Sequence, residues 1–341
     1  MKERESSANG GFLSFILAIS FALIPACMCS VILSERLNDL KHMQMISGMN
    51  LVSYWVSNYA FDILKVYSAT ISVYLIMELA HCHYDNVWIS FALYPWAIVP
   101  FTYVTTFFFQ SENFAQTLTV FLHFTFAGLG TILTFILRTF FLTYDLGDSM
   151  NWWLKVIPTF SLTNPIMFKS SKDKLLELRQ DLPEDDFHIE NLLGDFSNLF
   201  FQFCFYTAFL IVLETGLFDK INRAYCAHLV YNKRKGFVDE DVLEEEKRVE
   251  NQKDMAVRMS KFKKVYTAWF QEPFLAVERI SFGLDTGECF CLLGVNGAGK
   301  TTCFKSLTND IDPTGGSVSI TGLEVKNKFT KVRKVIGFCP Q

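Results

Sequence analysis

Residues 287–302 read GECFCLLGVNGAGKTT, and they set the expectation for the C-terminal part of the chain. The segment 294–301 satisfies G-x-x-x-x-G-K-[ST], the spacing of a phosphate-binding loop. Such a loop needs a strand before it and a helix after it. The apolar run CFCLL at 289–293 predicts a buried strand, and TCFKSLTND at 302–310 is compatible with a helix. We therefore expect the order strand, loop, helix.

The residue types of this loop suit the chemistry of phosphate binding. Glycine permits positive backbone dihedrals and close approach, so we expect the amides from Gly297 to Thr302 to line one concavity that binds phosphate oxygens. Lys300 can reach the β- and γ-phosphates, and the hydroxyl of Thr301 can ligate magnesium. The nucleotide-binding residues predicted in the loop are Gly294, Asn296, Gly297, Ala298, Gly299, Lys300, Thr301 and Thr302.

The flanking sequence predicts further strands. FKKVY at 262–266 and LAVERISFGLD at 275–285 precede the loop, and the second alternates apolar and polar residues. After the helix, DPTGG predicts a turn, and SVSITGLEV at 317–325 and VIGFCP at 335–340 predict two more strands. We expect the N-terminal part of an α/β P-loop nucleotide-binding domain over residues 259–341.

The rest of the chain differs in composition. Half of the 341 residues are hydrophobic, only 19% are charged and 35 are phenylalanine, which excludes disordered and collagen-like classes. The net charge is −8 over residues 1–218 and +4 over 219–341. Since a bilayer requires about 20 apolar residues per helix, we expect five spans in a transmembrane domain over 1–218. They are predicted at about 11–33, 54–77, 88–109, 117–137 and 196–218.

Two segments between these units are less regular. Residues 138–195 contain a run, 152–168, that is short and interrupted by Lys155, Pro158 and Pro165, so it either re-enters the membrane or lies on its surface. Residues 219–258 are charged and predict a cytosolic linker. With the nucleotide-binding unit inside the cell, five crossings place residues 138–195 outside.

Two ionisable residues fall inside the second predicted span. Asp62 and Lys65 are three residues apart, so they share one face of a helix. We favour a structural ion pair over a contact with a transported substrate, because an unpaired charge in the membrane is costly.

Three separated blocks resemble one known family. GECFCLLGVNGAGKTT, with DPTGG and IGFCPQ after it, resembles the first part of the nucleotide-binding domain of an ATP-binding cassette (ABC) transporter. The segment 32–63, ILSERLNDLKHMQMISGMNLVSYWVSNYAFDI, and the segment 238–249, VDEDVLEEEKRV, are similar to the A subfamily of lipid-exporter-like transporters.

The resemblance implies roles for further residues. Tyr266 would stack on adenine, and Gln341 would contact magnesium and relay the state of the nucleotide. Residues 36–53 would be the cytosolic segment that the nucleotide-binding domain grips, and 138–195 would hold exoplasmic re-entrant helices. The implied cofactors are ATP and Mg²⁺. The implied partners are a second transmembrane half with its own nucleotide-binding domain, and membrane lipid; no nucleic acid is expected.

The sequence also departs from that family. An L-S-G-G-Q loop, an acidic strand ending in Asp-Glu and a switch histidine are not found in these 341 residues, so catalytic residues are not predicted. We expect a fragment of the C-terminal half of such a transporter, from its second span to the glutamine loop, that moves lipid or another amphiphile. A nucleotide-gated channel or regulator, and a non-functional truncated product, remain alternatives. A membrane-tethered GTPase or kinase is disfavoured because the D-x-x-G at 312–315 lies in a predicted turn and no N-K-x-D follows it in these 341 residues.

Overall fold

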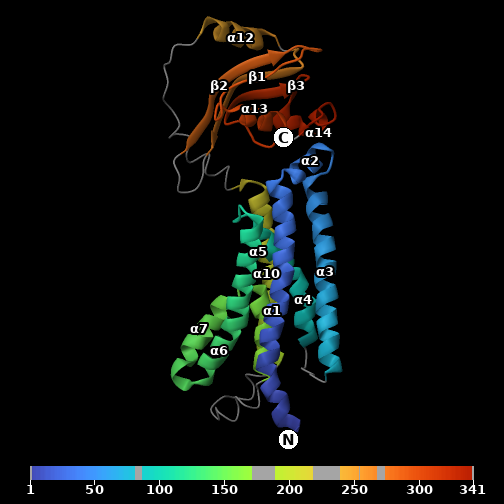
Figure 1. Cartoon of the computed structure of the whole chain (residues 1–341), viewed down its shortest axis with the longest axis vertical. Helices are drawn as coiled ribbons and strands as arrows, with labels where there is room; N and C mark the ends of the chain where they lie inside the picture. Colours follow the sequence, from blue (N-terminus) through green and yellow to red (C-terminus); the bar gives the residue numbers. More distant parts are fainter. Residues whose placement is uncertain are drawn as a thin grey trace. The chain divides into compact units, whose positions relative to one another are not determined.

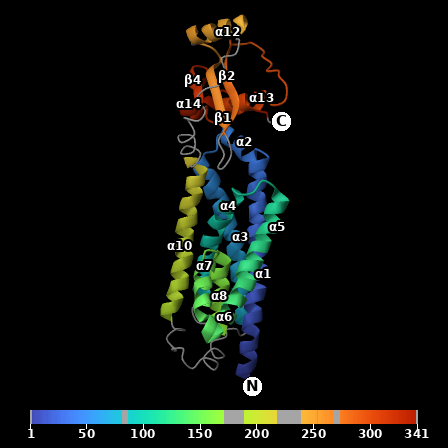
Figure 2. The ribbon, with the colours of Figure 1, turned by 90° about the vertical axis from the view of Figure 1, so that its left-hand side faces the viewer.

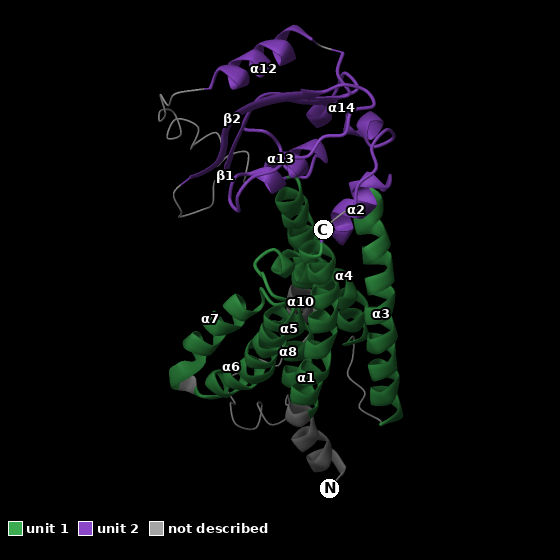
Figure 3. Ribbon diagram, turned by 45° about the horizontal axis from the view of Figure 1, so that its top comes forward, with its two compact units in different colours: residues 1–38, 52–215 green, residues 39–51, 216–341 purple. Residues whose placement is uncertain are grey.

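The computed structural model describes residues 2–80, 87–170, 189–217, 239–252, 254–266 and 273–339. The chain divides into two compact units (Figure 3), residues 1–38 with 52–215 and residues 39–51 with 216–341. The short segment 39–51 therefore belongs with the C-terminal unit, although it lies between two apolar helices in the sequence. The domain boundaries predicted at 218 and 258 stay predictions.

The first unit is a bundle of long helices that run side by side (Figures 1 and 2). Five helical stretches in the described residues are long and apolar enough to cross a membrane, so the predicted helical membrane domain is confirmed. The helices are α1 (Lys2–Leu37), α3 (Leu51–Leu79), α4 (Val87–Thr106), α5 (Glu112–Leu122), the π-helix η1 (His123–Leu129), α6 (Gly130–Thr139), the 3₁₀ turn η2 (Phe141–Thr143), α7 (Tyr144–Leu154), α8 (Pro158–Ser170) and α10 (Ile189–Glu214).

The fourth apolar stretch is not one regular helix, because the π-helix η1 interrupts it between α5 and α6. Small residues allow close packing here: a Cβ on Gly128 would lie 3.6 Å from the Ala18 side chain, and one on Gly130 would lie 3.0 Å from Leu154. The hydroxyl of Thr131 donates to the carbonyl of Ala127 within this stretch. The widened turn thus occurs where side chains of α1 and α7 pack close to this stretch.

The charged pair predicted in the second span is present. The ammonium of Lys65 lies 2.5 Å from Oδ1 of Asp62, and the hydroxyl of Tyr103 donates to Oδ2 of the same carboxylate at 2.6 Å. Asp62 is buried, so both of its oxygens need partners. The pair is therefore a structural contact within α3, and the hydrogen bond from Tyr103 joins it to α4.

The short helix α8 is buried deeply within the bundle. Phe160, Leu162 and Ile166 have no exposed surface, and α8 packs against α1, α4 and η1 (Figure 2). The Thr159 hydroxyl of α8 lies 2.9 Å from Nδ1 of His123. At 13 residues the helix is about 20 Å long, which is too short to cross a bilayer.

The break between α7 and α8 frees two backbone carbonyls, and α10 supplies donors to both. Asn198 and Gln202 donate amide hydrogens to the carbonyl of Lys155, and the hydroxyl of Tyr206 donates to the carbonyl of Val156 at 2.6 Å. These three residues are spaced by four along α10 and form its polar stripe. Irregular backbone is tolerated at membrane depth only when protein groups or water satisfy it. The polar stripe of α10 meets that requirement.

The second unit is built on a four-stranded sheet of order β2-β1-β3-β4, in which every neighbouring pair is antiparallel. In Figure 1, α12 lies on one face of this sheet, and α13 and α14 lie on the other. The elements are α2 (Leu40–Ile46), α12 (Glu240–Asn251), β1 (Val257–Tyr266), β2 (Phe274–Leu284), α13 (Lys300–Leu307), β3 (Gly315–Ile320), β4 (Leu323–Glu324) and α14 (Val325–Val332).

An irregularity in β1 shapes the core of this unit. Met259 and Phe262 are both fully buried, although strict alternation would put them on opposite faces. The pairing shifts register between them, and Lys261 has a φ of 47°. At the same point a Cβ on Gly316 of β3 would lie 2.2 Å from the Lys261 carbonyl oxygen, so only glycine fits. The bulge thus places both apolar side chains against α13 and α14.

Two predicted strands are wrong. Residues 289–293 and 335–339 have irregular backbone and join no sheet. A buried parallel strand needs hydrogen-bonding neighbours at its edges, and β2, which leads into 289–293, pairs only with β1 among the described strands. Phe290 instead stacks on Phe282, and Leu293 is 84% exposed. The strands predicted at 262–266, 275–285 and 317–325 correspond to β1, β2, and β3 with β4.

Candidate nucleotide-binding site

The loop between β2 and α13 carries the predicted phosphate-binding residues. Gly297 and Gly299 have φ values of 87° and 89°, which a side chain would strain. Gly294 does not share this conformation. It allows close approach, since a Cβ there would lie 3.2 Å from the Ala298 side chain. The loop curls back on itself between residues 294 and 298.

The helix predicted at 302–310 is present as α13, which begins at Lys300 and has Gly299 in the left-handed region at its N-cap. The first hydrogen bond of the helix runs from the amide of Cys303 to the carbonyl of Gly299, at 3.0 Å. The amides of residues 300–302 precede this bond, so they are the donors that a helix N-terminus offers to an anion. The Ala298 amide was also expected to bind phosphate. It instead donates to the Val295 carbonyl at 3.1 Å, which closes the loop.

Lys300 folds back over the loop from which it projects. Its ammonium donates to the carbonyl oxygens of Gly294, at 2.5 Å, and Val295, at 2.9 Å. Both partners are loop carbonyls rather than a carboxylate, and these contacts can be exchanged for phosphate oxygens without breaking an ion pair. Thr301, the predicted magnesium ligand, is exposed in the first turn of α13, whereas Thr302 is buried.

Tyr266, the residue expected to stack on adenine, ends β1 close to the loop helix. The residue is 38% exposed, and its hydroxyl lies 3.4 Å from that of Thr302. The ammonium of Lys264 lies 5.2 Å from the centre of the ring and donates to the carbonyl of Asp312 at 2.7 Å. Lys264 was not predicted as a site residue. Residues two apart in a strand lie on the same face, so its spacing from Tyr266 could have indicated that the two side chains are neighbours. Gln341 lies outside the described residues.

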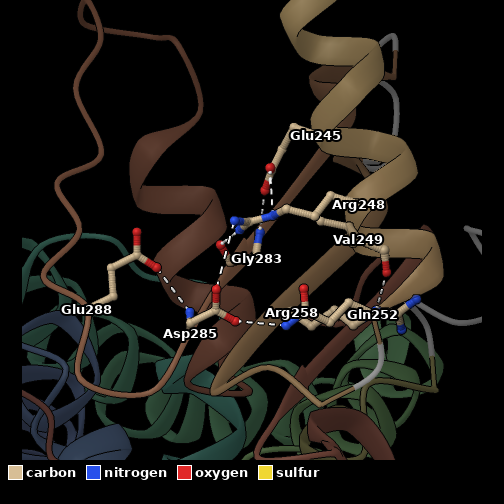
Figure 4. A network of polar contacts seen from close by, with 8 residues as sticks. All are labelled: Glu245, Arg248, Val249, Gln252, Arg258, Gly283, Asp285 and Glu288. Carbon is tan, nitrogen blue, oxygen red and sulfur yellow. Dashed lines mark hydrogen bonds and ion pairs between the residues drawn. The ribbon is translucent and has the colours of Figure 1, made fainter.

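A polar network holds the entry to this loop in place (Figure 4). Arg248 of α12 donates to the carbonyl of Gly283 at 2.6 Å, and the amide of Gly283 donates to the carboxylate of Glu245 at 2.9 Å. Beyond Gly283, the amide of Asp285 donates to the Glu288 carboxylate at 3.0 Å. Part of the segment predicted as a charged linker is therefore a docked helix that fixes the turn before the phosphate-binding loop.

The described structure thus joins a bundle of helices long and apolar enough to cross a membrane to a unit that carries the predicted phosphate-binding loop. This combination is that of a membrane transporter with a nucleotide-binding domain. The ABC-2 family transporter protein family matches residues 1–213, and the ABC transporter family matches residues 277–341. The first match covers more than half of the chain, and the chain belongs to the ABC-2 transporter family. It is an integral membrane protein with several spans, and its nucleotide-binding unit is cytosolic.

Curated relatives fall in the predicted A subfamily. The chain is 27% identical over 354 residues to human ATP-binding cassette sub-family A member 2, covering 96% of the chain and 14% of that protein. It is 26% identical to the mouse phospholipid-transporting ATPase ABCA3, covering 100% and 22%. It is 28% identical to the human retinal-specific phospholipid-transporting ATPase ABCA4, covering 96% and 15%. The resemblance to A-subfamily ABC transporters is confirmed, and the chain spans 14 to 22% of these relatives' length.

Proposed function

We propose that this chain is part of an ATP-driven transporter that moves a phospholipid or a similar amphiphile. The observation that carries the proposal is one polypeptide in which five apolar helices are followed by a loop with Gly297 and Gly299 at positive φ and Lys300 at the first position of the next helix. Two of the relatives are named as phospholipid-transporting ATPases, which favours a lipid substrate.

In this proposal, the amides of residues 300–302 and the ammonium of Lys300 bind the β- and γ-phosphates, after Lys300 leaves the carbonyls of Gly294 and Val295. The exposed hydroxyl of Thr301 suits a magnesium ligand, and Tyr266 offers a ring face to the base. Mg-ATP would supply the binding and hydrolysis energy of the transport cycle. Gln341 is proposed as a second magnesium contact on the resemblance alone.

The proposal includes a second nucleotide-binding domain and a second transmembrane half as partners, because cassettes of this class act in pairs. It also assigns α7 and α8 to a re-entrant hairpin at the membrane. The burial of α8 and the donors that α10 provides to the α7–α8 break support that assignment.

The direct test is Mg-ATP binding by the full chain in lipid nanodiscs. We expect Lys300→Ala to weaken binding by at least tenfold, because a charge-assisted contact to phosphate contributes about 1.5–3 kcal/mol. Lys326→Gln is the matched control, since Lys326 is a half-exposed cation on α14 that pairs with Asp312 outside the loop. Equal affinity of the wild type and Lys300→Ala would refute nucleotide binding at this site.

A further inference from the structure

Lys264 is a buried lysine of β1 that the proposed contacts with phosphate and magnesium do not use. It is 6% exposed, and its ammonium lies over the ring of Tyr266, 5.2 Å from the ring centre. The same ammonium donates to the carbonyl of Asp312 at 2.7 Å. Burial of an ammonium is costly unless other groups take the place of water, and here a carbonyl and the negative face of an aromatic ring do so. The cation therefore belongs to the immediate surroundings of Tyr266.

The acceptor of this hydrogen bond lies in a turn that is bound to β1. The amide of Thr314 donates to the carbonyl of Lys263 at 2.8 Å, and the amide of Val265 donates to the hydroxyl of Thr314 at 3.1 Å. These two hydrogen bonds lie on either side of Lys264 along the strand. Because they hold the turn that carries Asp312 against β1, the carbonyl that accepts from the Lys264 ammonium is fixed relative to the strand.

Tyr266 is contacted at a second point, its hydroxyl group. This hydroxyl lies 3.4 Å from the hydroxyl of Thr302, in the first turn of α13. Tyr266 is therefore adjacent both to the cation of β1 and to the helix whose N-terminal amides are the proposed phosphate donors. The residue as a whole keeps 38% of its surface exposed, which leaves it accessible to a ligand.

We propose that Lys264 positions Tyr266 for a purine nucleoside triphosphate, with the ammonium over one face of the ring and the base stacked on the opposite face. An ammonium attracts the π electrons of a ring toward itself. The opposite face becomes less negative, so it favours a neutral, electron-rich purine over a cationic ligand. Lys264 is a positioning residue, because it acts on the base only through Tyr266. The inference rests on the proposed nucleotide-binding function and adds the group that orients the base.

Comparison of Mg-ATP with Mg-tripolyphosphate binding by the full chain in lipid nanodiscs tests this role. Tripolyphosphate carries the same chain of three phosphates without the ribose and the base, so it reports the phosphate-binding loop alone. The substitutions are Lys264→Met, Lys264→Arg, Tyr266→Ala and the pair Lys264→Met/Tyr266→Ala. Lys263→Met is the matched control. Lys263 is the neighbouring half-buried lysine of β1, and within the part of the chain that the structure describes its side chain makes no hydrogen bond or ring contact with Tyr266.

We expect Tyr266→Ala to weaken Mg-ATP binding about tenfold, because the stacking of the base on the ring is lost. Lys264→Met should weaken it about fivefold, whereas Lys264→Arg should stay within about twofold of the wild type, since a guanidinium also lies favourably over an aromatic face. The pair should bind Mg-ATP no more weakly than Tyr266→Ala alone, because Lys264 acts through the ring. Every variant should keep the wild-type affinity for Mg-tripolyphosphate, and Lys263→Met should keep it for both ligands.

The two proposals fail in different ways. If the wild type binds neither Mg-ATP nor Mg-tripolyphosphate, the nucleotide-binding function fails and the role of Lys264 fails with it. If Lys264→Met weakens the binding of both ligands by the same factor, or of neither, Lys264 does not position the base, and the phosphate-binding loop stands. A loss of Mg-ATP affinity in Lys264→Arg as large as that in Lys264→Met would overturn the role of the cation in the same way.

Discussion

Replacement of Gly299 by alanine tests whether the phosphate-binding loop packs against β2. At a φ of 89°, any non-glycine residue costs roughly 1–2 kcal/mol. The new Cβ would also lie 2.6 Å from Cγ2 of Val277 and 3.0 Å from the carbonyl oxygen of Ala276. Overpacking of this kind costs about 1–3 kcal/mol. We expect a combined loss of about 3 kcal/mol in the local stability of β2 and α13.

The measurement is amide exchange of β2 and α13 in the full chain, where a loss of about 3 kcal/mol speeds exchange from the open state roughly 100-fold. Two controls separate the contributions. Gly287 has a φ of 85° and open space around it, so Gly287→Ala should show the conformational cost alone, about tenfold. Gly337 has neither a positive φ nor a close neighbour, so Gly337→Ala should change nothing. Equal effects of Gly299→Ala and Gly287→Ala would refute contact between the loop and β2.

Three further outcomes are expected. Tyr206→Phe removes the donor to the Val156 carbonyl and should destabilise the bundle by about 1 kcal/mol in thermal unfolding. The control Tyr59→Phe loses only a 3.4 Å contact and should have little effect. Equal shifts of the unfolding temperature in the two variants would contradict the role of the polar stripe. Burial raises the pKa of the Cys303 thiol, so maleimide should label it far more slowly than exposed Cys289 at neutral pH, as mass spectrometry of the labelled chain will show. The hydrogen bond and charge of Lys261 lower the pKa of Glu250. The Glu250 carboxylate therefore stabilises the docking of α12 at any pH above the ordinary pKa of a glutamate, and this stabilisation is lost as the pH falls through the lowered pKa. Exchange of α12 amides, corrected for the intrinsic effect of pH, should rise on acidification, and Lys261→Met should weaken that dependence.

The membrane helices could be predicted because the composition of each segment is enough to identify it as a span. A run of about 20 apolar residues has few alternatives to a helix that crosses a bilayer. The same reasoning identified Asp62 and Lys65 as a pair, since their spacing alone puts them on one face. It did not identify Tyr103 as the second partner of Asp62, because that contact depends on how α3 packs against α4.

The errors occurred where structure depends on distant partners. Residues 289–293 have the composition of a buried strand, but a strand forms only beside another strand, and none of the described strands pairs with this segment. The family resemblance implied that the nucleotide-binding domain grips residues 36–53, and α2 does belong to the second unit. Its contacts with Lys305, Asp310 and Arg333 were not apparent in its seven residues, because they depend on distant parts of the chain. The glycine, lysine and threonine of the phosphate-binding loop are recognisable from sequence because their spacing is local, whereas their roles toward a nucleotide remain predictions.

The polar stripe of α10 has a consequence for how the bundle is assembled. The carbonyl of Val156 accepts from Tyr206, and that of Lys155 accepts from Asn198 and Gln202 in addition to Ser161 of α8. Residues 198–206 are synthesised after both α7 and α8. The break between α7 and α8 therefore gains the donors of α10 only once this later helix has packed against it.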